Sequence, residues 1–416
     1  MDVRIPRGIQ RALCLAALLL PAHAGTIVPT PPTLQPADLD VTCPLPIDDQ
    51  PAARPSLTSP WTHPPLCVPS TDGTTKFCVY TNSRHGPRGW SILTTPETAA
   101  DSVWLLNRAL NDTDRTTTTA AVAARSREPP AYRVVDIAGK GKGVVTTRKV
   151  AKYEEILVDH ATFLVDILFT TQVPAFRGYR LLHAAVNQLA DPESVLTLGQ
   201  SNPLARDQVE NILRTNGFST KLGGAPHIAL YPVVSRINHG CQPNAYTLFK
   251  PETLQVSIRA ARDLEAGEEI THSYIPIGAP TSERAKRLSR WGFTCRCSLC
   301  EADAEAREAS DKRRAEIQQL RDHAIRAYQA GRAYQALRFT RQVINLLGPE
   351  GLWQLYPEQY ENVARIFYTL RDRANAEKYA NMSLGLLAEQ GEIPRADREA
   401  VERLLARFEE EEGGRY

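Results

Sequence analysis

Hydrophobic and polar positions follow different periods along the chain, and the changes of period divide it into segments. Residues 132–137 and 144–147 are short runs rich in β-branched and aromatic side chains, which predicts two strands. Between residues 172 and 213 apolar side chains recur at helical spacing, so this stretch is predicted to be helical. Its apolar face is expected to hold Leu181, Leu182, Ala185, Val186 and Leu189. The middle of the chain is therefore predicted to be of mixed α+β type.

The C-terminal part, residues 302–412, is rich in Ala, Glu, Arg and Leu and keeps helical spacing. Residues 329–336 and 369–376 align at an offset of 40 residues, with alanines recurring where helices would pack. This offset favours an all-helical lobe with tetratricopeptide-like helix pairs. Such a lobe either stabilises the domain before it or shapes the binding of a substrate or partner, and the pattern leaves both possibilities open.

The first residues have a third pattern. Basic residues precede an apolar run, residues 12–21, and an Ala-His-Ala sequence ends at Ala24, which predicts a secretory signal peptide over residues 1–24. The apolar run is too short to span a bilayer as a helix, and no later run of apolar residues is long enough, so we expect no membrane span. The expected location is the secretory pathway or the exterior, with the nucleus or cytoplasm as the alternative.

Residues 25–127 are predicted to form a linker rich in Pro and Thr, followed by a small N-terminal region in which aromatic and apolar residues return. Cys67 and Cys78 in this region either form a disulfide in an oxidising compartment or are buried singly. If they pair, Cys43 is left over, unless it takes one of them as its own partner. A polar stretch that ends in Pro129 and Pro130 places a domain boundary near residue 128.

Composition narrows the class of protein. The 416 residues are 42% hydrophobic and 23% charged, which is typical of globular proteins and excludes a wholly disordered, collagen-like or multi-span membrane protein. At about 150 residues per domain the length favours two or three domains. The 49 basic residues nearly balance the 47 acidic ones, so no overall positive field favours nucleic acid, and we expect no direct nucleic-acid binding.

Four motifs between residues 139 and 300 contain candidate catalytic, cofactor-binding or metal-binding residues. Residues 139–143 read Gly-Lys-Gly-Lys-Gly between the two predicted strands, which by itself indicates only a glycine-rich hairpin turn. Residues 238–244 read Asn-His-Gly-Cys-Gln-Pro-Asn, and residues 267–274 read Gly-Glu-Glu-Ile-Thr-His-Ser-Tyr. Residues 295–300 read Cys-Arg-Cys-Ser-Leu-Cys.

In this order the four motifs resemble those of the SET-domain protein-lysine methyltransferases, over about residues 130–300. The helical tail extends the resemblance toward the SET and MYND subfamily. No cysteine lies between Cys78 and Cys241, so a MYND zinc finger inserted in this region is excluded. The resemblance implies a SET fold of small twisted β-sheets with a pseudoknot, a helical insertion, a post-SET zinc segment and the helical lobe. The implied bounds are 128–278 for the SET domain, 279–305 for the post-SET segment and 306–416 for the lobe.

The resemblance also implies transfer of a methyl group from S-adenosylmethionine to a lysine of a protein substrate. The attacking amine must be neutral, and burial beside a sulfonium cation lowers the lysine pKa. Tyr274 would place its hydroxyl at the transfer point, and Phe218 and Tyr231 would line the lysine channel. For Phe218, Tyr231 and Asn216, ordinary packing in the core is the alternative. The residues implied to contact the cofactor are Lys140, Gly141, Lys142, Gly143, Asn216, Asn238, His239, Tyr274 and Phe293.

Cys295, Cys297 and Cys300, together with the distant Cys241, offer four thiolates, the number that a structural zinc ion prefers. Disulfides are the alternative, but a Cys-x-Cys pair points its sulfurs poorly at each other. A zinc–thiolate site fits less well with an oxidising compartment, so the predicted zinc site and the predicted signal peptide are in tension.

The alternative function is an inactive SET-fold binding protein, against which the intact Tyr274 argues. The oligomeric state is not indicated.

Overall fold

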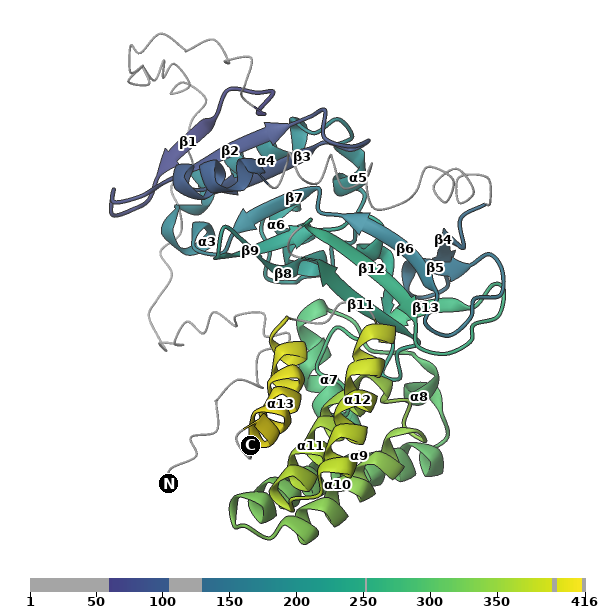
Figure 1. The fold of residues 1–416 in the computed structure, drawn as a ribbon. Helices are drawn as coiled ribbons and strands as arrows, with labels where there is room; N and C mark the ends of the chain where they lie inside the picture. The colour runs from purple at the N-terminus through teal and green to yellow at the C-terminus, as the bar shows by residue number, and fades with distance from the viewer. Residues whose placement is uncertain (1–59, 105–128, 251–252, 391–394, 414–416) are drawn as a thin grey trace, which may run out of the picture. The chain divides into compact units, whose positions relative to one another are not determined.

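The computed structural model, drawn in Figure 1, describes residues 60–104, 129–250, 253–390 and 395–413. Contacts divide the chain into two units at residue 60, and all the described residues belong to the second unit. The predicted signal peptide, residues 1–24, and Cys43 lie outside the described residues. Within the described part, no helix combines the length and the apolar character that crossing a membrane requires.

The largest sheet has six strands in the order β1-β2-β3-β7-β9-β8. The bounds are β1 Leu66–Pro69, β2 Lys76–Asn82, β3 Trp90–Thr94, β7 Phe163–Asp166, β8 Phe218–Leu222 and β9 Ala225–Leu230. Strands β3 and β7 are parallel, with Ile92 opposite Leu164, while the other neighbours are antiparallel. Strands β1–β3, which precede residue 128, therefore share one sheet with strands from the predicted SET region.

Cys67 on β1 lies directly opposite Cys78 on β2, and the structure joins the two in a disulfide. Of the two arrangements that the sequence left open for this pair, the structure has the disulfide.

Two smaller sheets complete the β part. One has the order β10-β13-β5-β4 and the other the order β11-β12-β6. The bounds are β4 Tyr132–Ile137, β5 Gly141–Thr146, β6 Glu155–His160, β10 Asn238–His239, β11 Ala245–Lys250, β12 Gln255–Ala260 and β13 Glu269–His272. Fully buried Val144, Ile258 and Ile270 from these sheets share one apolar core with Ile92 and Leu164 of the large sheet. The predicted arrangement of several small sheets is confirmed.

The helical insertion lies between β7 and β8, as predicted. It consists of α3 Phe169–Gln172, α4 Ala175–Asn187, α5 Glu193–Leu196 and α6 Gln208–Asn216. The buried face of α4 includes Leu181, Leu182, Ala185 and Val186, which pack with Phe163 and Leu230 of the large sheet. Asp207 caps the start of α6, and its side chain accepts hydrogen bonds from the backbone N–H groups of Val209 and Glu210.

One short helix, η1 Val234–Arg236, lies between β9 and β10. After β13 the described elements are all helices. Their bounds are α7 Thr281–Leu288, η2 Ser289–Trp291, α8 Ser298–Glu301, α9 Ala304–Gln329, α10 Ala333–Leu347, η3 Trp353–Leu355, α11 Tyr356–Thr369, α12 Arg373–Gln390 and α13 Arg395–Gly413. Helix α9 packs on α10, and α11 packs on α12.

The 40-residue offset seen in the sequence reappears in these helix pairs. Gly331 and Arg371 occupy equivalent turns, and both have positive φ, 73° and 62°. Ala336 and Ala376, 40 residues apart, are both fully buried in the same core. Small side chains at these two positions allow the helices of each pair to approach closely, which accounts for the recurring alanines.

Candidate functional site

The segments of three of the four motifs lie in one small sheet. Strand β10 pairs in parallel with β13, so that Asn238 lies opposite Thr271 and His239 opposite His272, and β13 pairs with β5 on its other side. Strand β5 carries Gly141 and Gly143 of the glycine-rich hairpin. The sheet therefore brings together residues that lie about a hundred positions apart in the sequence.

Tyr274 follows β13 directly and is tied to the β10 segment at both ends. Its backbone N–H donates to Nδ1 of His239 at 3.1 Å, and its hydroxyl donates to the carbonyl oxygen of Ile237 at 2.8 Å. Burial, together with the negative charge of Glu269, raises the pKa of the Tyr274 hydroxyl well above its usual value. The hydroxyl is therefore protonated at neutral pH and acts as a donor with a fixed direction.

Aromatic rings surround Tyr274. Its ring centroid lies 5.4 Å from that of His239, 5.1 Å from that of His272 and 5.6 Å from that of Trp291. Phe293, predicted to contact the cofactor, is partly exposed and lies edge-on to Tyr274, with ring centroids 6.2 Å apart. The predicted catalytic tyrosine thus stands among aromatic rings, of which that of Phe293 is partly exposed.

The predicted channel residues Phe218 and Tyr231 contact each other, with ring centroids 5.6 Å apart. Phe249 lies 5.8 Å from Phe218, and His272 stacks on Phe218 at 5.8 Å. We call these four residues the channel cluster, and His272 joins the cluster to Tyr274. Sequence reasoning gave no role to Phe249 or His272. A phenylalanine in an alternating strand and a histidine inside a motif gave no signal that they would meet at Phe218.

The imidazole of His272 is neutral. Burial, followed by the nearby His239, lowers the pKa of His272 to about 3. Its Nδ1 lies 3.4 Å from the hydroxyl of Thr247. The channel cluster therefore carries no charge of its own near pH 7.

Glu269 connects Asn238 to the glycine-rich hairpin. One carboxylate oxygen accepts a hydrogen bond from Asn238 Nδ2 at 2.9 Å, and the other pairs with Lys140 Nζ at 2.7 Å. Asn238 Nδ2 also donates to the carbonyl oxygen of Lys142 at 3.2 Å. A Cβ at Gly143 would lie 2.5 Å from Ile137 Cγ1 and 3.0 Å from Asn238 Nδ2, so this approach requires glycine. The role of Glu269 depends on partners far away in the sequence, and the motif alone did not indicate it.

Asn216 is the last residue of helix α6. Its Nδ2 donates to the carbonyl oxygens of Gly199 and Ile212, at 2.7 and 2.8 Å. Its backbone carbonyl oxygen accepts from Ser235 in η1, and the neighbouring Thr215 accepts from the indole of Trp291. The structure thus places Asn216 between the helical insertion and the Tyr274 surroundings, while its predicted contact with the cofactor stays a prediction.

A buried carboxylate supports the segment that enters β10. Asp159 on β6 is 2% exposed, and its Oδ2 accepts the backbone N–H groups of Val233 and Val234, at 2.6 and 3.0 Å. Its Oδ1 accepts a hydrogen bond from Arg88, at 3.0 Å. Asp159 therefore holds the start of η1, three residues before Ile237. Arg88 lies in the region that the sequence analysis had placed outside the SET domain.

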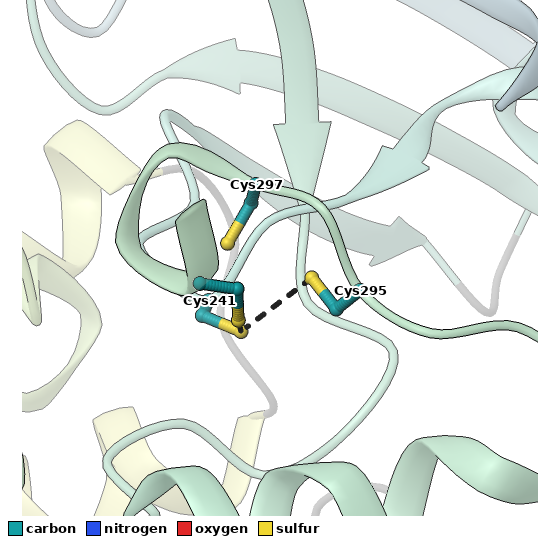
Figure 2. Close-up of side chains that lie close together, drawn as sticks. Cys241, Cys295 and Cys297 are labelled. Atoms are coloured by element: carbon teal, nitrogen blue, oxygen red, sulfur yellow. Dashed lines mark hydrogen bonds between the residues drawn. The ribbon is translucent and has the colours of Figure 1, made fainter. Parts of the chain in front are cut away.

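The four motif cysteines converge, as Figure 2 shows for Cys241, Cys295 and Cys297, whose sulfur atoms point toward one another. Cys241 Sγ lies 3.8 Å from Cys295 Sγ and 3.7 Å from Cys300 Sγ, and all four sulfurs lie within 4.8 Å of one another. Four zinc–sulfur bonds of about 2.3 Å in a tetrahedron separate neighbouring sulfurs by about 3.8 Å, so this cysteine cluster fits a structural zinc ion.

Comparisons with known proteins agree with the motifs. Residues 190–275 match the family model of the SET domain. The chain is 30% identical over 200 residues to the histone-lysine N-methyltransferase set5 of Schizosaccharomyces pombe, covering 46% of this chain and 57% of that protein. It is 34% identical over 110 residues to the human N-lysine methyltransferase SMYD2, covering 26% of this chain and 24% of that protein. The chain thus spans about half the length of the first relative and a quarter of the second. The predicted resemblance to SET-domain lysine methyltransferases is confirmed.

Proposed function

We propose that the chain is an S-adenosylmethionine-dependent protein-lysine N-methyltransferase. The observation that carries this proposal is the pair of hydrogen bonds by which Tyr274 meets His239 and Ile237, beside the channel cluster. The match to the SET domain and the names of the relatives support the same activity. The substrate we propose is a lysine side chain of another protein.

The cofactor would supply a methyl group on a sulfonium, and the protein's own residues would prepare the amine. The half-buried rings of Phe218 and Phe249 would remove water from the lysine, with the fully buried Tyr231 packed behind them, and desolvation favours the neutral, nucleophilic form of the amine. The neutral His272 keeps the cluster free of charge. The hydroxyl of Tyr274, held on the Ile237 carbonyl, would orient the reacting groups, so that the displacement starts from an aligned geometry.

The residues that would hold the cofactor come from three places around the small sheet. Asn238 and His239 lie on β10, the glycine-rich hairpin lies beside Asn238, and Phe293 stands next to Tyr274. We propose contacts from Lys140, Gly141, Lys142, Gly143, Asn216, Asn238, His239, Tyr274 and Phe293. The cysteine cluster would hold one zinc ion and thereby fix the segment that carries Phe293.

The proposal is tested with purified full-length chain. Titration calorimetry should show binding of S-adenosylmethionine, and labelled cofactor should transfer its methyl group to core histones or to the chain itself. Wild type and Tyr274→Phe are compared in the same assay. Binding without transfer would favour the alternative, an inactive SET-fold interaction protein, and absence of binding to the zinc-loaded chain would contradict both the cofactor and the enzyme.

We also propose that the protein enters the secretory pathway. The disulfide between Cys67 and Cys78 supports an oxidising compartment, because such bonds are rare in the cytosol. The nucleus or cytoplasm is the alternative that a reduced pair would favour. N-terminal sequencing of protein recovered from culture medium and from cell fractions decides between them, since secretion predicts a mature chain that begins after Ala24.

A further inference from the structure

The first helix of the C-terminal lobe reaches the cysteine cluster through one buried side chain. Arg314 on α9 is 1% exposed, and its Nη2 donates to the carbonyl oxygen of Cys241 at 3.1 Å. Its Nη1 lies 3.4 Å from the carbonyl oxygen of Ala279, at the start of the segment that leads to the other three cysteines. One guanidinium thus spans the two stretches of backbone that supply the cluster.

A buried carboxylate fixes the direction of this guanidinium. Glu350, in the connection between α10 and η3, is fully buried and accepts a hydrogen bond from Arg314 Nε at 2.7 Å. Glu350 also accepts from Ser310 Oγ and from Arg313 Nε, both at 2.6 Å. Because a buried charge must be paired and hydrogen-bonded, Glu350 and Arg314 hold each other in a single arrangement.

A second cation approaches the cluster from α7. Arg284, 3% exposed, donates to the same Ala279 carbonyl oxygen at 2.9 Å, and its Nη2 lies 3.9 Å from Cys300 Sγ. Four thiolates around a divalent cation carry a net charge of about −2, so nearby guanidinium groups lower the cost of that charge. Hydrogen-bonding partners of this kind fix the orientation of metal ligands and tune how tightly the metal is held.

We propose that Arg314 is a positioning residue of the four-cysteine metal site, and that α9 of the helical lobe is therefore part of that site. The inference rests on the proposed zinc ion. It goes beyond the proposed function because it gives the lobe a definite task, which is to hold the Cys241 backbone in place for metal binding. Of the two roles that the sequence left open for the lobe, this task makes it a structural component of the site.

The test measures zinc release from purified full-length chain, with a chromogenic chelator as the probe and no methylation step. Arg314→Met should release zinc at a chelator concentration at least about 10-fold lower than wild type requires, the size of effect expected when a partner of a metal ligand is lost. Arg313→Met is the matched control. Arg313 pairs with the same Glu350 carboxylate but is partly exposed, and its hydrogen bond there leaves Cys241 untouched. This control should release zinc as wild type does.

A conservative variant guards against a failure to fold. Arg314→Lys keeps the positive charge beside Glu350, but an ammonium cannot span the carbonyl oxygens of Cys241 and Ala279 while it pairs with Glu350. It should fold and still release zinc more easily than Arg313→Met. If a folded Arg314→Met or Arg314→Lys holds zinc as tightly as wild type, the inference is wrong while the zinc proposal stands. If wild type itself holds no zinc, the metal proposal and this inference fail together, whatever the chain's methyltransferase activity.

Discussion

The hydroxyl of Tyr274 donates a hydrogen bond to the carbonyl oxygen of Ile237, and 2.8 Å separates the two atoms. Ile237 immediately precedes Asn238, so this bond joins the end of one motif to the start of another. The direction of the hydroxyl is thus set by the chain's own backbone. Because the proton is committed to Ile237, the lone pairs of the hydroxyl oxygen also have a fixed direction. A polar group that is fixed in advance removes a cost that would otherwise fall in the transition state.

Tyr274→Phe should lower the rate of methyl transfer far more than the affinity for S-adenosylmethionine. Removal of one preorganised polar group typically costs about 100-fold or more in turnover, whereas the lost hydrogen bond to Ile237 should cost about 1 kcal/mol of stability. The measurements are single-turnover transfer of a labelled methyl group and cofactor titration. Tyr246→Phe, at a buried tyrosine in another cluster, is the control and should retain the rate. A loss confined to affinity would make Tyr274 a binding residue.

Asp159→Asn should destabilise the fold and weaken cofactor binding. The substitution keeps the shape of the side chain but places amide donors against Arg88 or against the N–H groups of Val233 and Val234. Disruption of a buried and charged hydrogen-bond network of this kind costs about 3 kcal/mol. Denaturant unfolding gives the stability, and calorimetry at a temperature where the variant is folded gives the cofactor affinity.

Asp166→Asn is the matched control, because Asp166 is equally buried on neighbouring β7 but accepts from the N–H of Leu168, away from η1. It should lose stability with little change in cofactor affinity. Equal affinities in the two variants would show that Asp159 supports the fold alone and has no particular influence on the β10 segment.

The sequence alone predicts those features of the fold that depend on residues close together in the chain. The hairpin around Gly141 and the helical insertion each follow from residues within one motif or one period, and three of the four clustered cysteines lie within one motif. By contrast, strands β2 and β3 are buried on both faces, so their sequences lack the alternation of apolar and polar residues that would have predicted strands. Strand β3 is joined to the rest of its sheet by a parallel pairing, in which Ile92 lies opposite Leu164. Such a register depends on tertiary packing and cannot be read from neighbouring residues.

The same limit applies to the supporting polar residues. Asp159, Glu269 and Arg314 acquire their roles only through partners 74, 31 and 73 positions away, respectively Val233, Asn238 and Cys241. A buried charge is distinguished from a surface charge only once the fold has formed around it. The candidate site residues could thus be named from the sequence, whereas the buried polar residues that contact their segments could not.

The neutral His272 should make the protein less stable in mild acid. Its pKa is about 3 in the folded chain, against the ordinary histidine value of 6.5 that it regains on unfolding, so the unfolded state binds more protons between these values. Stability therefore rises with pH across this window and is lost as the pH falls below about 6.5, by up to about 1.4 kcal/mol per pH unit for one such group. Denaturant unfolding between pH 5 and pH 7 measures the slope.

His272→Asn removes one titrating group and should reduce this slope, whatever it does to stability at pH 7, while His239, whose pKa burial lowers to about 4, continues to contribute. Phe218→Leu alters packing against the same ring without removing a titrating group, so it should shift stability but keep the slope of wild type. Identical slopes for wild type and His272→Asn would mean that other groups account for the acid sensitivity.

The disulfide and the cysteine cluster should be opened to alkylation by different reagents, the disulfide by a reductant and the cluster by a zinc chelator. Cys67 and Cys78 form a disulfide, whereas Cys241, Cys295, Cys297 and Cys300 are free thiols in the structure. Without a reductant, an alkylating agent should leave Cys67 and Cys78 unmodified, and it should modify the other four only after a chelator has removed zinc. Cys297→Ser leaves three thiolates, which cannot complete a tetrahedral site, so it should lower zinc content well below one ion per chain and loosen the segment around Phe293.

Mass spectrometry of the alkylated peptides and elemental analysis of zinc provide the two measurements, and proteolysis between residues 279 and 305 reports the loosening. Cys67→Ser is the control. It removes the disulfide, whose loop of 11 residues should contribute about 3 kcal/mol, yet should leave zinc content unchanged. If the four cysteines are alkylated equally fast with and without a chelator, no metal protects them, and their convergence in the fold would have to be explained by packing alone.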